Sequence, residues 1–297
     1  MTEKIRLALE LYEQDPEGAA QSLQALIEED QTQFVRAAAA LRTEGDSPGF
    51  QPLIKLLAQS NGVIRQLCDP GFLDKESSID LVKRIAAIEP ALDSTLVRLL
   101  PGRGWDSSDP AQALAAERVL ELLGAISVSN RIVPMLAHLI QHPNARLRAK
   151  VSLLIARWTR NVRMAEDRLD ETDARVRANA VEGLWGDKTG RATSVLWRAV
   201  NDADNRVVGN ALFGLYELRD QKIIPYIVNM ATHEKPKFRA TAAWTMGQTR
   251  DPQFLSALET LTHDLYAAVR KCATRAMGQI RKVEDAEATS DAISQNL

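Results

Sequence analysis

The sequence has few of the residues that cross-link a fold or carry it through a membrane. Its 297 residues include only two cysteines, Cys68 and Cys272, which lie far apart in the chain. We therefore expect no structural disulfide, and a reducing cytoplasm is the simplest compartment. No run approaches about 18 apolar residues, so no segment is expected to span a membrane. The first residues also lack the apolar core and cleavage site of a signal peptide.

Motifs that carry catalysis are also missing. His233-Glu234 is followed by Lys-Pro-Lys, so the second histidine of a zinc-binding HExxH motif is absent. His142 and His233 share a turn position, but two whole repeats lie between their units, so a joint metal site is improbable. The chain has no phosphate-cradling glycine motif and no serine nucleophile elbow. We expect no enzymatic activity, no metal and no cofactor.

Charge is nearly balanced overall but unevenly distributed. Residues 1–130 hold 12 Lys and Arg against 20 Asp and Glu, whereas residues 131–282 hold 25 against 15. The last fifteen residues hold four acids and no base. This asymmetry bears on the choice of partners rather than on the fold.

What the sequence does contain is a short pattern that returns at nearly fixed spacing. Five dipeptides stand 29, 31, 31 and 31 residues apart, with apolar residues eleven before, four after and eight after each. Self-similarity at this period is typical of stacked helical repeats. The first residues of the dipeptides, which we call the anchors, are Leu147, Val176, Val207, Phe238 and Val269.

The pattern resembles HEAT repeats of the short bacterial kind, also found in PBS-lyase-like proteins. The segments FRATAAWTMG (Phe238–Gly247) and AVRKCATRAMG (Ala268–Gly278) carry this resemblance. It implies an all-α, right-handed solenoid of about eight two-helix repeats. HEAT-like deoxyhypusine hydroxylases carry His-Glu pairs just after the anchor arginine. At those positions this chain has other residues, so the motif of that activity is absent and the activity is excluded. The residues are Ala149, Ala178, Ala240 and Lys271.

Four segments follow from the pattern and its breaks. Residues 1–44 are expected to form three capping helices, and residues 45–130 irregular HEAT-like helical pairs. Residues 131–282 hold the regular repeats. Residues 283–297 are acidic and aperiodic, so we expect a disordered tail.

The turn acids and the arginines after the anchors resemble the polar ladder of HEAT arrays. In such arrays these residues form hydrogen bonds and ion pairs between neighbouring units, so we interpret them as structural. The ladder should be interrupted where the chain departs from the pattern, at His142, His233 and Val208.

A binding face is predicted at positions three, six and ten residues after each anchor. These positions fall opposite the buried side of a helix, and in HEAT solenoids the exposed side of the second helices usually lines the concave surface. Exposed aromatic residues beside amides and arginines have the composition of a binding hot spot. The candidate partner-binding residues are Lys150, Arg157, Asn179, Glu182, Asn210, Phe213, Glu217, Trp244, Gln248 and Arg275.

Three functions compete for this face. The first is a non-catalytic scaffold that binds a partner protein or peptide on Phe213 and Trp244, with Lys150, Arg157 and Arg275 selecting acidic partners. The second is nucleic-acid binding, as in HEAT-like DNA glycosylases, which the basic half and its tryptophans favour. The third is a HEAT-like bilin lyase subunit, for which no tetrapyrrole-specific pattern is present. The first is the main prediction.

Overall fold

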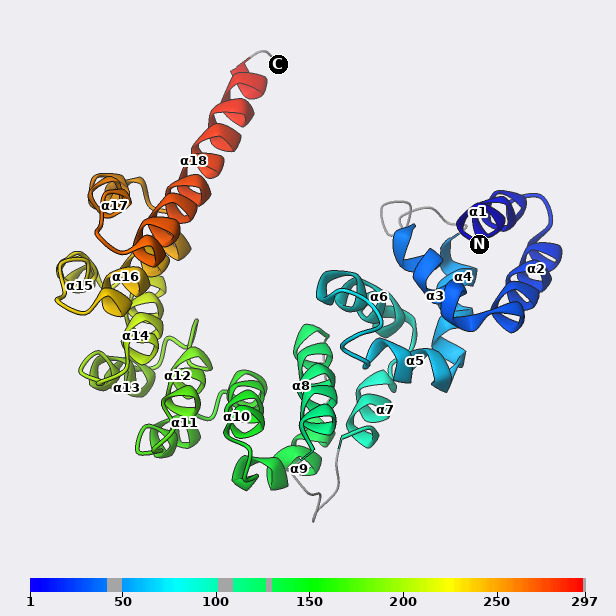
Figure 1. The fold of residues 1–297 in the computed structure, drawn as a ribbon, viewed down its shortest axis with the longest axis horizontal. Helices are drawn as coiled ribbons and strands as arrows, with labels where there is room; N and C mark the ends of the chain where they lie inside the picture. The colour runs from blue at the N-terminus through cyan, green and yellow to red at the C-terminus, as the bar shows by residue number, and fades with distance from the viewer. Residues whose placement is uncertain (42–49, 101–108, 127–129, 296–297) are drawn as a thin grey trace. The chain divides into compact units, whose positions relative to one another are not determined.

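The computed structural model describes residues 1–41, 50–100, 109–126 and 130–295, and every regular element within these ranges is helical (Figure 1). Contacts divide the chain into two compact units, Met1–Val151 and Ser152–Leu297, which we call unit 1 and unit 2. The expected all-α repeat fold is confirmed. The boundary expected between residues 44 and 45 lies outside the described residues.

Unit 1 begins with three helices, as expected for residues 1–44. Asp15 and Asp30 begin the second and third of these helices, each accepting a backbone N–H with its carboxylate. Asp109 caps a later helix in the same way, with Pro110 at its first position. The helices of unit 1 are α1 (Thr2–Leu11), α2 (Pro16–Glu29), α3 (Gln31–Ala40), α4 (Phe50–Gln59), α5 (Asn61–Leu67), α6 (Lys75–Ile88), α7 (Leu92–Arg98), α8 (Pro110–Ala125) and α9 (Val133–Leu136).

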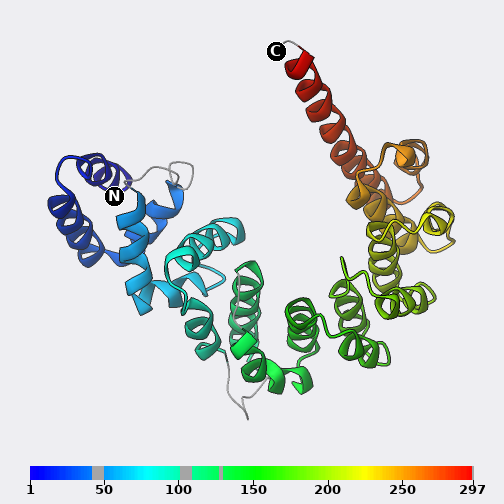
Figure 2. The same cartoon turned by 180° about the vertical axis from the view of Figure 1, so that it is seen from behind.

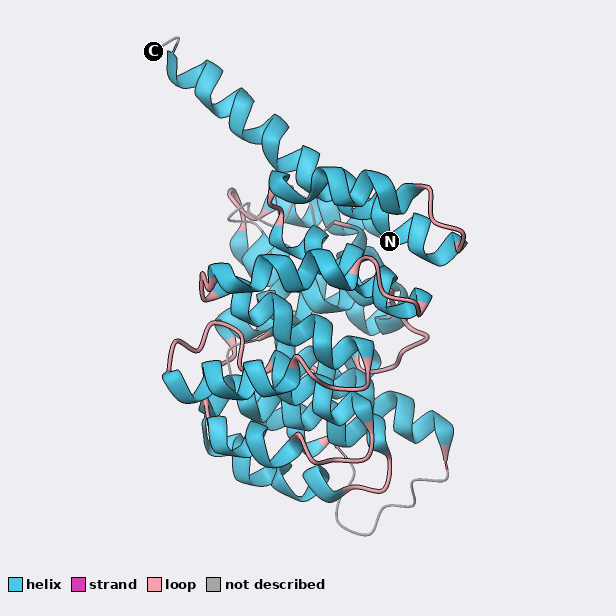
Figure 3. Cartoon of the chain, turned by 90° about the vertical axis from the view of Figure 1, so that its left-hand side faces the viewer, coloured by secondary structure: helices cyan, strands magenta, loops and turns pink. Residues whose placement is uncertain are grey.

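Unit 2 is built from helical pairs, and helix α10 (Ala145–Thr159) spans the boundary between the units. The remaining helices are α11 (Val162–Arg168), α12 (Ala174–Glu182), α13 (Gly190–Ala199), α14 (Asn205–Glu217), α15 (Ile224–Met230), α16 (Pro236–Thr249), α17 (Leu255–Thr262) and α18 (Ala267–Gln295). The second helices pack on one another in chain order, α12 on α14, α14 on α16 and α16 on α18. The first helices lie along one side of this row (Figure 2), and short loops join the helices of each pair (Figure 3).

The five anchors explain why the pairs stack. Each anchor is the third residue of its second helix and is buried. The residues four positions later and eleven positions earlier are also buried in all five repeats. Burying a valine, leucine, isoleucine or phenylalanine side chain contributes about 1.5–3 kcal/mol and burying an alanine contributes less, so the repeated set favours stacking of the pairs.

Glycine lets consecutive second helices approach closely. A Cβ atom on Gly209 would lie 2.3 Å from Cγ2 of Thr241 on the next second helix, and one on Gly183 would lie 2.4 Å from Cβ of Ala156 on the preceding one. Real Cβ atoms do not approach other carbons this closely, so these positions require glycine for the observed packing.

The acidic tail differs from its prediction. The backbone of α18 is helical through Gln295, whereas we expected disorder over 283–297. Alanine and glutamate are strong helix formers, and extending an existing helix avoids the cost of nucleation. The lack of apolar periodicity therefore did not prevent helix formation here.

Candidate protein-binding surface

An arginine follows four of the five anchors, and it is held in the turn between the helices of its own repeat. Its Nη1 donates to two backbone carbonyls, those six and five residues earlier. These eight donor–acceptor distances lie between 2.8 and 3.1 Å. The four arginines are Arg148, Arg177, Arg239 and Arg270.

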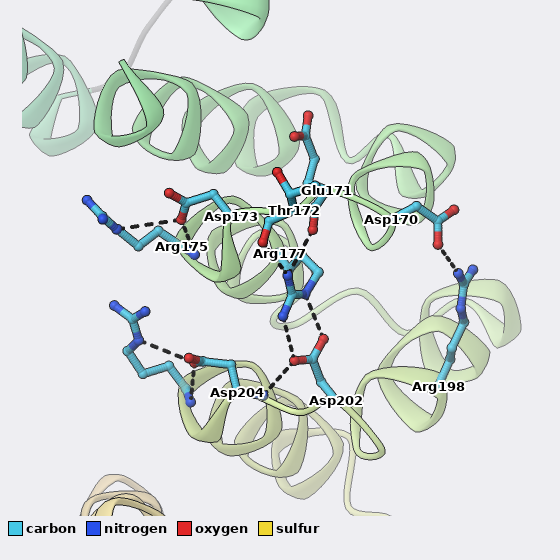
Figure 4. A network of polar contacts seen from close by, with 10 residues as sticks. Asp170, Glu171, Thr172, Asp173, Arg175, Arg177, Arg198, Asp202 and Asp204 are labelled. Carbon is cyan, nitrogen blue, oxygen red and sulfur yellow. Dashed lines mark hydrogen bonds and ion pairs between the residues drawn. The ribbon is translucent and has the colours of Figure 1, made fainter. Parts of the chain in front are cut away.

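Two of these arginines also reach the turn of the next repeat, as a ladder requires. Arg177 donates from Nε and Nη2 to the carboxylate of Asp202, at 2.8 and 2.9 Å (Figure 4). Arg239 binds Asp264 in the same way, at 2.6 and 3.0 Å. Hydrogen bonding from Arg239 lowers the pKa of Asp264, against the opposing effect of burial. For Asp202, burial raises the pKa, but the bonds from Arg177 and a backbone N–H outweigh it and the pKa is lowered.

The ladder is interrupted at Val208 and His233, as predicted. Val208 stands where the other repeats have arginine and is buried. His233 stands where Asp202 and Asp264 stand in their turns, and its ring stacks on Phe238 with centroids 4.2 Å apart. Nδ1 of His233 accepts the N–H of Lys235, as the carboxylate of Asp202 accepts that of Asp204. Histidine therefore keeps the turn but supplies no carboxylate to the neighbouring repeat.

Three aromatic rings meet on the side of unit 2 formed by the second helices. Phe213 of α14 and Trp244 of α16 lie with ring centroids 6.4 Å apart. Trp185, in the turn after α12, contacts both, at 4.8 Å from Phe213 and 6.5 Å from Trp244. Trp244 remains 36% exposed, and the other two rings are half-buried. The structure thus brings together the two predicted aromatic residues.

A pocket of about 400 Å³ adjoins this cluster. Three candidate residues line it: Phe213, Glu217 and Gln248. Tyr216 is also in the lining and donates to the carboxylate of Asp251 at 2.5 Å. Burial and this hydrogen bond raise the pKa of Tyr216 to about 12, and partial desolvation raises the pKa of Glu217. We call the three rings, Glu217 and Gln248 the aromatic surface.

The predicted cations are mostly engaged elsewhere. Arg157 binds Glu182 at 2.6 Å, so two candidate residues neutralise each other. Lys150 lies in unit 1, 3.9 Å from Glu121. Arg275 is exposed on α18, and among the described residues no cation–π pair joins it to the three rings. The structure therefore does not gather these residues into one basic rim.

The prediction for Asn210 is wrong. Its side chain is only 8% exposed and donates from Nδ2 to the carbonyl oxygen of Ala178 at 2.9 Å. Close packing of α12 on α14 turns this position into the interface between second helices. The equivalent Asn179 is half-buried.

Trp185 was missed because the helix ends before it. Trp185 is nine residues after its anchor, a position that on a continuous helix lies outside the predicted binding face. However, α12 ends at Glu182, and a turn sets the direction of the Trp185 ring. Its Nε1 donates to the carbonyl oxygen of Asn210 at 2.8 Å, which fixes the ring beside Phe213. The aromatic residue itself was the only signal available in the sequence.

Within the part of the chain that the structure describes, no three His, Cys, Asp or Glu residues gather in a way that could hold a metal ion. In the same residues, no helix is both long enough and apolar enough to cross a membrane.

Comparison with known proteins identifies the repeats. Residues 192–278 and, overlapping them, residues 224–293 match the family model for HEAT repeats. Together they cover roughly a third of the chain. No curated protein matches the chain in sequence.

Solved structures show distant likeness. Human deoxyhypusine hydroxylase in complex with glycerol is 16% identical with a TM-score of 0.39, over 86% of this chain and 99% of that one. An engineered protein is 16% identical with a TM-score of 0.33, over 93% and 88%. The E. coli protein YibA is 14% identical with a TM-score of 0.38, over 85% and 97%. Structural similarity at this level supports no conclusion about function.

Proposed function

We propose that this chain, whose residues 192–293 are HEAT repeats, is a non-catalytic scaffold that binds a partner protein or peptide on its aromatic surface. One observation carries the proposal. Three rings from three consecutive repeats meet beside a pocket, and one of them, Trp244, keeps a third of its surface in solvent. Tryptophan and neighbouring aromatic residues in such positions dominate the binding energy of many interfaces.

The chemistry of the surface favours an apolar anchor from the partner, with polar groups around it. Phe213 lies on the boundary between the rings and the pocket, so an aliphatic or aromatic side chain entering there would contact both. Glu217 and Gln248 supply an acceptor and an amide at the pocket wall. Because Arg157 is already paired with Glu182, the case for selecting acidic partners is weaker than the sequence suggests.

Nucleic-acid binding is the second candidate, favoured by the basic balance of residues 131–282. Several arginines of this region are committed to carboxylates, including Arg177, Arg198 and Arg239. Each of these pairs removes a cation that could neutralise a phosphate. The aromatic surface accounts for Trp244 and Phe213 without using those arginines, and so we rank protein binding first.

The test compares capture of partners by the wild type and by the double variant Phe213→Ala/Trp244→Ala. We expect the double variant to lose at least about 30-fold in affinity, since a hot-spot residue contributes about 2 kcal/mol or more. Leu265→Ala is the matched control, because Leu265 is apolar and 91% exposed on the turn before α18. Thermal melting of both variants checks that the repeats still unfold cooperatively.

A salt titration with labelled DNA separates the two candidates. Binding that weakens steeply with salt, disappears in Arg275→Glu and is unchanged in Trp244→Ala would overturn the protein-binding proposal. Equal capture by the wild type and the double alanine variant would do the same.

A further inference from the structure

The interruption of the ladder at Val208 leaves two backbone acceptors without the donor that the other repeats provide. In the other four regular repeats, an arginine occupies this position and donates to the carbonyls six and five residues earlier. The corresponding oxygens here belong to Asp202 and Ala203. Among the described residues, neither oxygen accepts a hydrogen bond. Valine has no donor to offer them.

A pocket of about 380 Å³ lies at this position. Both Asp202 and Ala203 line it, together with Val208 itself. Its apolar wall includes Leu212, Met230 and Phe238, all of them buried in the fold. The two residues that carry the free carbonyl acceptors thus line a pocket with an apolar wall, at the repeat position where the other regular repeats hold an arginine.

We propose that this pocket binds a guanidinium group carried on an arginine side chain of a partner chain, which completes the ladder in place of Val208. A guanidinium presents planar N–H donors that can reach two acceptors at once, as Nη1 of Arg177 does in the preceding repeat. Its aliphatic stem would lie on Val208 and Leu212. The site is separate from the aromatic surface and does not depend on the function proposed for it.

The charges around the pocket set how strongly such a group binds. The carboxylate of Asp202 is held by Arg177, so these two neutralise each other. Lys235 lines the pocket and opposes a cation. His233 occupies the position where the intact rungs have aspartate. Replacing His233 by aspartate would therefore supply the missing carboxylate and strengthen binding, because charge-assisted hydrogen bonds are the stronger ones.

Binding is best followed by NMR of the methyl groups of Val208, Leu212 and Met230 in the full chain. The probes are three short blocked peptides, alike except for a central arginine, lysine or citrulline, and agmatine as a free guanidino compound. We expect saturable shifts with the arginine peptide. Lysine should bind at least about threefold more weakly, because an ammonium lacks the planar pair of donors, and citrulline more weakly still, because it lacks the charge.

Two variants test the site in opposite directions. His233→Asp should tighten binding of the arginine peptide by about three- to tenfold. Val208→Arg should abolish the saturable shift, here followed at Leu212 and Met230, while keeping or raising the melting temperature, because the new side chain would occupy the pocket and bind the two carbonyls. If Val208→Arg disturbs the fold, His233→Asp alone still decides the question.

Three results would overturn the proposal: no shift with the arginine peptide, an unchanged shift in a folded Val208→Arg variant, or weaker binding in His233→Asp. Binding of agmatine without binding of the peptide would overturn the partner chain as the source. The Phe213→Ala/Trp244→Ala variant should bind the arginine peptide as the wild type does, which separates this site from the aromatic surface.

Discussion

Replacing Arg177 by methionine tests whether the ladder, rather than ion pairing in general, holds neighbouring repeats together. The guanidinium makes four hydrogen bonds, two to the carboxylate of Asp202 and two to the carbonyls of Glu171 and Thr172 (Figure 4). The side chains of Arg177 and Asp202 are only 15% and 14% exposed, so solvent screens their interaction weakly.

The magnitude follows from these four bonds. A hydrogen bond contributes about 0.5–1.5 kcal/mol net, and one to a charged group about 1.5–3 kcal/mol. The four bonds share one guanidinium and are not additive, and methionine keeps most of the apolar stem. We therefore expect Arg177→Met to lower the free energy of unfolding by about 3 kcal/mol. For a unit of this size, that corresponds to a fall in Tm of roughly 6–12 °C.

Urea and thermal melting followed by circular dichroism measure the loss, with Arg157→Met as control. Arg157 makes one ion pair, to Glu182 at 2.6 Å, and its side chain is 44% exposed, so its removal should cost less than about 1 kcal/mol. A double-mutant cycle with Asp202→Asn should show strong coupling to Arg177. Equal losses in the two methionine variants, or an additive cycle, would refute the reasoning.

Two further predictions concern pH and packing. Hydrogen bonding from Arg239 holds the pKa of Asp264 below its ordinary value of 3.8, despite the opposing effect of burial. The interaction of the Asp264 carboxylate with Arg239 therefore stabilises the fold above pH 3.8, and this stabilisation is lost as the pH falls through the folded-state pKa of Asp264. Asp264→Asn should consequently lower Tm at pH 7, and its difference from the wild type should shrink in melts at progressively lower pH. Gly209→Ala should cost about 1–3 kcal/mol in urea melts because the added methyl group has no space. Gly190→Ala, where the added carbon would meet no atom within 4 Å beyond its chain neighbours and its own helix backbone, should be neutral or slightly stabilising. Equal effects of the two substitutions would contradict the packing argument.

The sequence predicts the parts of the fold that depend on periodicity. The anchors and their apolar neighbours repeat in every unit, so their burial follows from the pattern alone. The break in the ladder at Val208 and His233 was also predictable, because valine has no donor and histidine no carboxylate. These features need only the identity of a residue and its position in the repeat.

The candidate site was predicted less well, for three physical reasons. Projection of a single helix places Asn210 on an open side, but α14 packs closely on α12, and Asn210 is buried between these two helices. Trp185 lies beyond the end of its helix, so helical spacing gives no direction for its ring. The pairing of Arg157 with Glu182 joins side chains of different repeats, which the periodicity of one repeat does not show.

The junctions between repeats differ in their sensitivity to salt. Three arginine–carboxylate pairs join α11 and α12 to the following pair: Arg177–Asp202, Arg191–Glu166 and Arg198–Asp170. Across the next junction, the described residues show no such pair, and the polar contacts are hydrogen bonds such as that from Asn205 to Thr241. Two of these pairs, Arg191–Glu166 and Arg198–Asp170, are exposed, so ionic strength weakens the first junction through them and has less effect on the second. Because stacked repeats can open separately, salt shifts the relative stability of neighbouring parts of the array.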